Sequence, residues 1–165
     1  MTRISKITLI VLLALIASFL IAKHRYPGKP PATLPPGHCD PDLWSHVSEK
    51  ERLHVIAECT AVEGRVVSLH PASDGDLHIA LNPENKSVLN LVNVLHAHGE
   101  LVVEIICEHP PADANKDDQA ACGTFHSQIT IPYVGDRVRI TGAYVTDRDN
   151  GWNEVHPVTS IEILR

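Results

Sequence analysis

An unbroken apolar run opens the chain, with no charged residue between positions 7 and 22. A helix of this length rises about 24 Å, and the snorkelling side chains of Lys6 and Lys23 help it to approach the ~30 Å hydrocarbon thickness of a bilayer. A small soluble domain does not need such a run at its start. We therefore predict a transmembrane helix within residues 1–25 that meets the membrane through residues 4–22.

Signal peptidase requires small residues at the first and third positions before its cleavage site. The candidate residues Ala17 and Ala22 are each preceded, two positions earlier, by a leucine (Leu15 and Leu20). The pattern favours an uncleaved signal anchor, and a removed signal peptide is the alternative.

The next stretch, residues 26–37, contains five prolines and two glycines. Such a composition excludes helix and central strand, and it is typical of a semi-extended spacer. We expect residues 38–165 to form one domain beyond this linker.

Within that domain the hydrophobic positions alternate with period two, which indicates strands. The clearest case is residues 136–145, where Val138, Ile140 and Tyr144 alternate with polar residues. The other predicted strands are residues 60–69, 76–81, 101–107 and 153–164, and short helices are expected after Asp40 or Asp42 and within residues 86–96.

Glycines within two of these strands indicate tight coiling. Gly64 and Gly142 fall in strand interiors, where a missing side chain allows a sheet to curve and close. With no βαβ alternation, we predict a mainly β fold, namely a small closed, OB-like barrel of five strands with one or two short helices. An open β-sandwich is the alternative.

All four cysteines follow the apolar segment. An even number of cysteines in an exported domain indicates disulfides. We prefer the pairing Cys39–Cys59 and Cys107–Cys122, the second of which would stabilise a polar loop by on the order of 3 kcal/mol through chain entropy. No Cys-x-x-Cys pair is present, which argues against a zinc ribbon.

The charge is divided unevenly along the chain. Residues 1–37 hold five basic and no acidic residues, so the remainder has nine basic and twenty acidic residues, a net charge of −11. A domain this acidic repels phosphate backbones, so nucleic acid is not an expected partner. Its expected partners are the membrane, through residues 4–22, and a protein or small-molecule ligand of unknown identity.

Four motifs resemble those of a group of uncharacterised exported bacterial proteins. They are C-x4-G-x-V at Cys59, D-G-D-x-H at residues 74–78, G-D-R-V-R-I-T-G at residues 135–142 and G-W-x-E-x-H-P at residues 151–157. The resemblance spans residues 39–164. It implies an OB-like domain and assigns no activity.

Two pairs of polar residues form the main candidate site. Asp76 and His78 share one strand face, and Glu154 and His156 share another, because side chains two apart point to the same side. If the two strands approach each other, these four side chains could bind zinc or another divalent ion, or activate water for hydrolysis. A structural polar network is the favoured interpretation of these residues, and with it no cofactor is expected; the metal site is the alternative.

Two further residues are candidate binding positions. Trp152, in a polar turn, could be an exposed binding aromatic or could be buried against the barrel end, and Asp74 could add an oxygen to the site. The sequence contains no G-x-S-x-G motif and no phosphate-binding loop, and we predict no catalytic residue. The favoured function is therefore a membrane-anchored, extracytoplasmic binding or scaffolding domain, and the alternative is a metal-binding domain or metal-dependent hydrolase.

Overall fold

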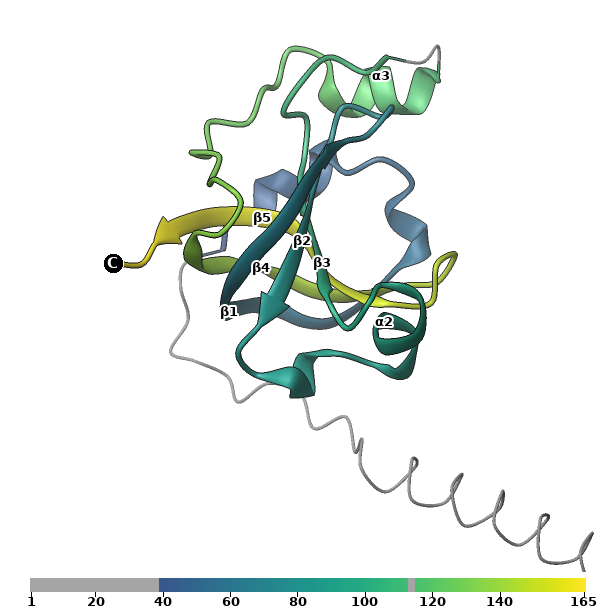
Figure 1. Cartoon of the computed structure of the whole chain (residues 1–165). Coiled ribbons are helices and arrows are strands. Elements are labelled where there is room, and N and C mark those ends of the chain that lie inside the picture. The colour runs from purple at the N-terminus through teal and green to yellow at the C-terminus, as the bar shows by residue number, and fades with distance from the viewer. Residues whose placement is uncertain (1–38, 113–114) are drawn as a thin grey trace, which may run out of the picture.

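A computed structural model describes residues 39–112 and 115–165 of the chain (Figure 1). The fold is mainly β, as predicted, with five strands and few helices. The strands are β1 (Leu53–Pro71), β2 (Leu77–Pro83), β3 (Leu101–Ile105), β4 (Arg137–Asp147) and β5 (Asn153–Ile163).

The five strands pair in the order β1-β2-β3-β5-β4, and β4 pairs in turn with β1, so that the sheet closes on itself as a barrel. The first strand makes this possible because its later half pairs with β2 while most of its length pairs with β4. The ladder between β3 and β5 is parallel, and the other four ladders are antiparallel.

The main core fills the inside of the sheet with side chains that alternate along each strand. On β2, for example, Leu77, Ile79 and Leu81 point inward, and Tyr144 on β4 donates its hydroxyl hydrogen to the carbonyl oxygen of Val88. The remaining buried members of this core are Val62, Val66, Leu89, Leu101, Val103, Ile105, Val138, Ile140, Val155 and Val158.

Gly64 and Gly142 allow close backbone approach where strands cross. A Cβ atom at Gly142 would lie 2.4 Å from the carbonyl oxygen of Pro157 and 2.7 Å from a methyl carbon of Val155. At Gly64 it would lie 2.6 Å from the carbonyl oxygen of Asn82. The pairing register shifts on either side of Gly142, so this glycine sits where β4 and β5 bend past each other.

Short helices fill the connections. A 3₁₀ helix, η1 (Pro41–His46), is capped by Asp40 as expected, η2 (Lys50–Arg52) leads into β1, and η3 (Lys86–Val88) precedes α2. The helix α2 (Leu91–His96) begins with a capping box between Asn90 and Asn93.

The helix α3 (Lys116–Cys122) falls within the polar loop between Cys107 and Cys122, where no helix was expected from the sequence. Asn115 caps its first turn, and Asp117 and Asp118 follow at positions where negative charge stabilises a helix N-terminus. This local signal was present in the sequence, but a helix of seven residues is too short to give a hydrophobic period.

A second apolar cluster covers the outside of the sheet near α3 and η1. Its buried members are Val47, Leu53, Ile106, Cys107, Cys122, Ala143 and Val145. The structure contains the disulfides Cys39–Cys59 and Cys107–Cys122, which is the pairing that we preferred from the sequence. Two disulfides are typical of a domain in an oxidising, extracytoplasmic compartment.

Among the described residues, no helix has both the length and the apolar composition needed to cross a membrane. The predicted transmembrane helix and the linker lie outside the described residues.

The close contacts at Gly142 lead to a first prediction. Gly142→Ala should lower the free energy of unfolding by about 2–3 kcal/mol, because the new methyl group overlaps backbone and side chain of β5. Urea unfolding of the purified full-length protein measures the effect. Ser160→Ala, at an exposed position of β5, is the control and should change stability by less than about 0.5 kcal/mol; equal stability of the two variants would contradict the prediction.

Candidate functional site

A group of polar side chains lies on the outer face of the sheet, across β2, β3 and β5. Because Leu77, Ile79, Val103 and Val155 point into the barrel core, their neighbours along the strands point outward. These neighbours are His78 on β2, Glu104 on β3, and Glu154 and His156 on β5, and His78 pairs directly with Glu104 in the ladder. We call this group, together with Asp76, the acidic cluster.

His156 is at the centre of the acidic cluster and has 1% side-chain exposure. Its Nδ1 lies 2.7 Å from Glu104 Oε2 and 3.3 Å from Glu154 Oε1, and the directed hydrogen bond goes to Glu154. On the other side of the ring, Nε2 has no hydrogen-bond partner and lies 4.0 Å from Asp76 Oδ2. A buried polar atom without a partner costs about 1–3 kcal/mol, so this nitrogen is an unusual feature.

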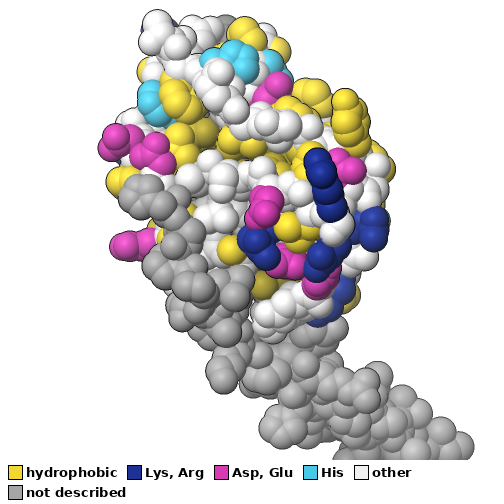
Figure 2. Space-filling view, turned by 90° about the vertical axis from the view of Figure 1, so that its left-hand side faces the viewer, with side chains coloured by type: hydrophobic (Ala, Val, Ile, Leu, Met, Phe, Trp, Pro, Cys, Tyr) yellow, Lys and Arg dark blue, Asp and Glu magenta, His cyan; other side chains and the backbone are white. Residues whose placement is uncertain are grey.

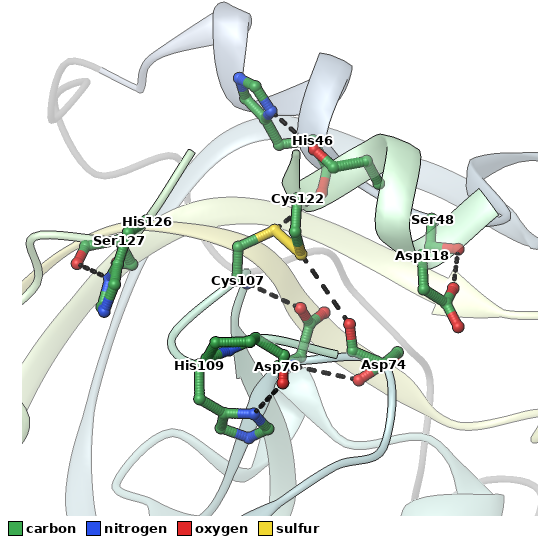
Figure 3. Close-up of a disulfide and its surroundings, with 12 residues drawn as sticks. His46, Ser48, Asp74, Asp76, Cys107, His109, Asp118, Cys122, His126 and Ser127 are labelled. Atoms are coloured by element: carbon green, nitrogen blue, oxygen red, sulfur yellow. Dashed lines mark hydrogen bonds between the residues drawn. A yellow bond between two sulfur atoms is a disulfide. The ribbon is translucent and has the colours of Figure 1, made fainter. Parts of the chain in front are cut away.

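Asp76 is placed by the turn between β1 and β2. Its backbone N–H donates to Asp74 Oδ1 at 3.0 Å, and its own Oδ1 accepts from the backbone N–H of Cys107 at 2.8 Å. Figure 3 shows this carboxylate beside the Cys107–Cys122 disulfide, with Asp74 next to it. One oxygen of Asp76 is therefore used for structure, and the other faces His156.

Arg52 and Asp147 complete the surroundings. Arg52 forms an ion pair with Asp147 and lies 3.9 Å from Glu104, and its side chain is 18% exposed. Asp147 is fully buried at the end of β4, where it also accepts hydrogen bonds from the backbone N–H groups of Asp149 and Asn150. Arg52 thus covers the acidic cluster on the side of the residues that precede β1.

The buried charges perturb one another strongly. Burial alone would lower the pKa of His156, but the facing Glu104 carboxylate and its neighbour Glu154 reverse this effect and raise the pKa to about 10. Burial would raise the pKa of Glu104, but the charge of His156 lowers it to about 2. His156 and Glu104 therefore form a charged pair at neutral pH.

The other two carboxyl groups of the cluster behave differently. Burial raises the pKa of Asp76 to about 6, even though the nearby His156 acts in the opposite direction. Burial also raises the pKa of Glu154. For both carboxylates, the nearby positive charge and hydrogen bonds thus do not fully offset the loss of hydration on folding.

A metal ion could be held by Asp76, Glu104 and His156. Each offers one ligand atom, and the three atoms lie within 4.8 Å of one another. An ion about 2.0–2.2 Å from each ligand would fit between His156 Nε2 and Asp76 Oδ2, which are 4.0 Å apart. Glu154 Oε1 holds Nδ1 of the same ring, which is the usual way of orienting a metal-binding histidine.

The four residues predicted from the sequence therefore lie close together, in an arrangement that the sequence did not specify. Asp76 and Glu154 contact opposite sides of His156, whereas His78 contacts Glu104, with its Nε2 3.4 Å from Glu104 Oε1. Glu104 links the two histidines and was missed. The signal for it was a lone glutamate within the apolar run L-V-V-E-I-I-C (residues 101–107), since a carboxylate within such a strand is costly unless it is paired.

The two candidate binding residues have structural contacts. Trp152 is half-buried and donates its Nε1–H to Glu154 Oε2 at 2.9 Å, so it covers the cluster from the β4–β5 turn. Asp74 is half-buried and caps the turn that holds Asp76. A ligand-binding role for either residue stays a prediction.

No protein-family model matches this chain, and a search of curated proteins finds no match either. The function is therefore argued from the site alone.

The charged pair predicts how stability depends on pH. A histidine has a pKa of about 6.5 in the unfolded chain and His156 has one of about 10 in the folded protein. The native state therefore holds an extra proton between these values, and the stabilisation by His156 is fully present below pH 6.5 and is lost as the pH rises toward 10. The free energy of unfolding should fall by up to about 1.4 kcal/mol per pH unit over this range.

Urea unfolding of the metal-free, full-length protein between pH 6.5 and 9 measures this slope. His156→Gln should flatten it, whereas His54→Gln, at an exposed position of β1, should leave it unchanged. A wild-type slope equal to that of His156→Gln would show that His156 is not charged in the folded state.

Proposed function

We propose that this protein is a membrane-anchored, extracytoplasmic domain that binds a divalent cation through Asp76, Glu104 and His156. The observation that supports this most directly is the buried Nε2 of His156, which has no hydrogen-bond partner and faces a carboxylate oxygen 4.0 Å away. A cation between these two atoms would satisfy both.

The charge balance supports the same proposal. Four buried carboxyl groups, those of Asp76, Glu104, Asp147 and Glu154, share two cationic partners, Arg52 and protonated His156. Without a further cation, Asp76 and Glu154 must either take up protons or remain charged in a poorly solvated place. A divalent ion bound at Nε2 displaces the proton of His156, so it adds one net positive charge to the cluster without burying another side chain.

The donor atoms indicate which ions would suit the site. One imidazole nitrogen and carboxylate oxygens are ligands of zinc and manganese, and a site without sulfur does not select the softest ions. His78 is the most accessible member of the acidic cluster, with 38% side-chain exposure, so an ion would enter past it.

The burial of the ligands favours holding an ion over hydrolysis. Asp76, Glu104 and His156 have exposures of 6%, 2% and 1%, and a substrate would have to reach an ion bound among them. The proposal is therefore metal binding without hydrolysis, which develops the alternative drawn from the sequence and not the favoured binding or scaffolding domain of unknown ligand.

The place of the cluster in the barrel also supports a binding function. The strand order, a long first strand paired on both sides and a parallel β3–β5 ladder are those of an OB-like barrel. Barrels of this kind commonly bind ligands on the face of strands 2 and 3 and with the loops that follow strands 1 and 4. The acidic cluster lies on that face, between Asp76 in one of these loops and Trp152 in the other; this argument is an analogy of fold.

Nucleic acid remains an unexpected ligand for this domain. The residues of the domain have a net negative charge, and three of its described arginines are paired with acids: Arg52 with Asp147, and Arg137 and Arg139 with Glu63. Figure 2 shows basic side chains interleaved with acidic ones on the face turned to the viewer. An interleaved surface gives no continuous track for a phosphate backbone.

Metal analysis tests the proposal. The purified full-length protein, stripped with a chelator and dialysed against Zn²⁺ or Mn²⁺, should retain about one ion per chain and melt at a higher temperature than the stripped protein. Asp76→Asn, Glu104→Gln and His156→Gln should each reduce retention by about tenfold or more.

Glu63→Gln is the matched control, because it alters a carboxylate in a surface ion-pair network instead of one in the cluster. It should keep the full ion content. Wild-type protein that retains no ion and shows no thermal shift with either metal would end the proposal.

The membrane anchor is tested separately. The full-length protein should remain in the membrane fraction after alkaline carbonate washing, because residues 4–22 hold it there. A variant that lacks residues 1–25 should not be exported, and its cysteines should therefore react with a maleimide. Full-length protein that is soluble and has four reactive thiols would contradict both the anchor and the extracytoplasmic location.

A further inference from the structure

The Cys107–Cys122 disulfide lies directly beside the acidic cluster. Cys107 follows β3 and Cys122 ends α3, and their exposures are 1% and 6%. Figure 3 shows the two sulfur atoms next to the Asp76 carboxylate, which accepts a hydrogen bond from the backbone N–H of Cys107. Asp76 is therefore common to the disulfide and to the cluster.

The two sulfur atoms and Asp76 form a second group of potential metal ligands. One atom from each of the three residues lies within 4.8 Å of the other two. Sulfur binds a metal ion as the thiolate, so this group cannot act while the disulfide is intact. Breaking the disulfide would turn a crosslink into two ligands already placed beside a carboxylate.

We propose that reduction of Cys107–Cys122 creates a second metal site, formed by Cys107, Cys122 and Asp76, for a thiophilic divalent cation such as Zn²⁺. In the first step a dithiol transfers two electrons and two protons to the disulfide, giving two thiols, and is itself oxidised to a disulfide. In the second step the cation replaces the two thiol protons, which pass to solvent.

The surroundings of the sulfur atoms suit the reduced form. Cys107 Sγ lies 3.7 Å from the carbonyl oxygen of His46, and Cys122 Sγ lies 3.8 Å from the carbonyl oxygen of Asp74. Each thiol would thus find an acceptor in place when the disulfide opens.

The charge and the donor type favour zinc over harder ions. Thiolate sulfur binds Zn²⁺ at about 2.3 Å and carboxylate oxygen at about 2.0–2.2 Å, so three donors within 4.8 Å need only small shifts to reach one ion. Two thiolates beside Asp76 would repel one another without a cation. The second site should therefore take up zinc with higher selectivity over Mn²⁺ than the acidic cluster does.

The two donor groups compete because they share Asp76. An ion bound by the thiolates would take the carboxylate that faces His156 Nε2 in the oxidised protein. Reduction would thus move the preferred ion position from the acidic cluster to the sulfur atoms. This second site depends on the placement of Asp76 and not on the proposed function, since it needs neither Glu104 nor His156.

The test uses full-length protein carrying Cys39→Ser and Cys59→Ser, so that Cys107–Cys122 is the only disulfide. Protein reduced with a phosphine, which does not bind zinc as dithiols do, is supplied with Zn²⁺ alone or Cd²⁺ alone. Reduction should create tight zinc binding with one ion held by the thiolates, and Cd²⁺ should give a thiolate charge-transfer band. Asp76→Asn should weaken this uptake by about tenfold or more while thiol titration still finds two thiols.

Controls separate this site from the acidic cluster and from an unfolded chain. Glu104→Gln and His156→Gln should retain uptake that depends on reduction, even if the oxidised protein binds no ion and the proposed function fails. Further replacement of Cys107 and Cys122 by serine should abolish it, and circular dichroism shows whether the reduced chain stays folded. Absence of uptake after reduction, or uptake that is equal in Asp76→Asn, overturns the inference.

Discussion

His156 and Glu104 face each other at 2.7 Å with side-chain exposures of 1% and 3%, on a face of the sheet that would otherwise meet water. Charged groups this deeply buried must be paired and covered, because removal of either partner leaves a charge with neither water nor a counter-charge. The surrounding parts meet this requirement. Arg52 closes one side, Trp152 covers Glu154, and the turn that holds Asp76 closes the side next to the disulfide.

This requirement explains why the domain has two apolar clusters. The inner one makes the barrel, as it would in any small β protein. The outer one, which includes Val47, Ile106 and the Cys107–Cys122 disulfide, fixes the N-terminal segment and α3 over the sheet. The Cys107–Cys122 disulfide and the second cluster therefore hold in place part of the layer that keeps water from the charged residues.

The parts that depend on local pattern were predictable from the sequence. Period-two alternation and, for β3, a short apolar run indicated the strands, and the interior positions of Gly64 and Gly142 indicated where strands approach closely. The preferred pairing of the cysteines, one of three that four cysteines allow, is the one that forms. Glu104 was not found, because its role depends on which strand lies beside β5, and that neighbour is set by a parallel pairing between distant segments. The sequence could show that four polar residues shared strand faces, but not that a fifth lay between them.

The Cys39–Cys59 bond would have a mechanical consequence for a domain attached, as we propose, through its N-terminal side. It joins the first described residue to the interior of β1, 20 residues further along the chain. A pull applied at residue 39 therefore passes through the two sulfur atoms into β1, which is held by β2 and β4 along its length. The intervening residues 40–58, with Arg52 among them, bear no tension, so movement of the tether would not draw the arginine away from the charges beneath it.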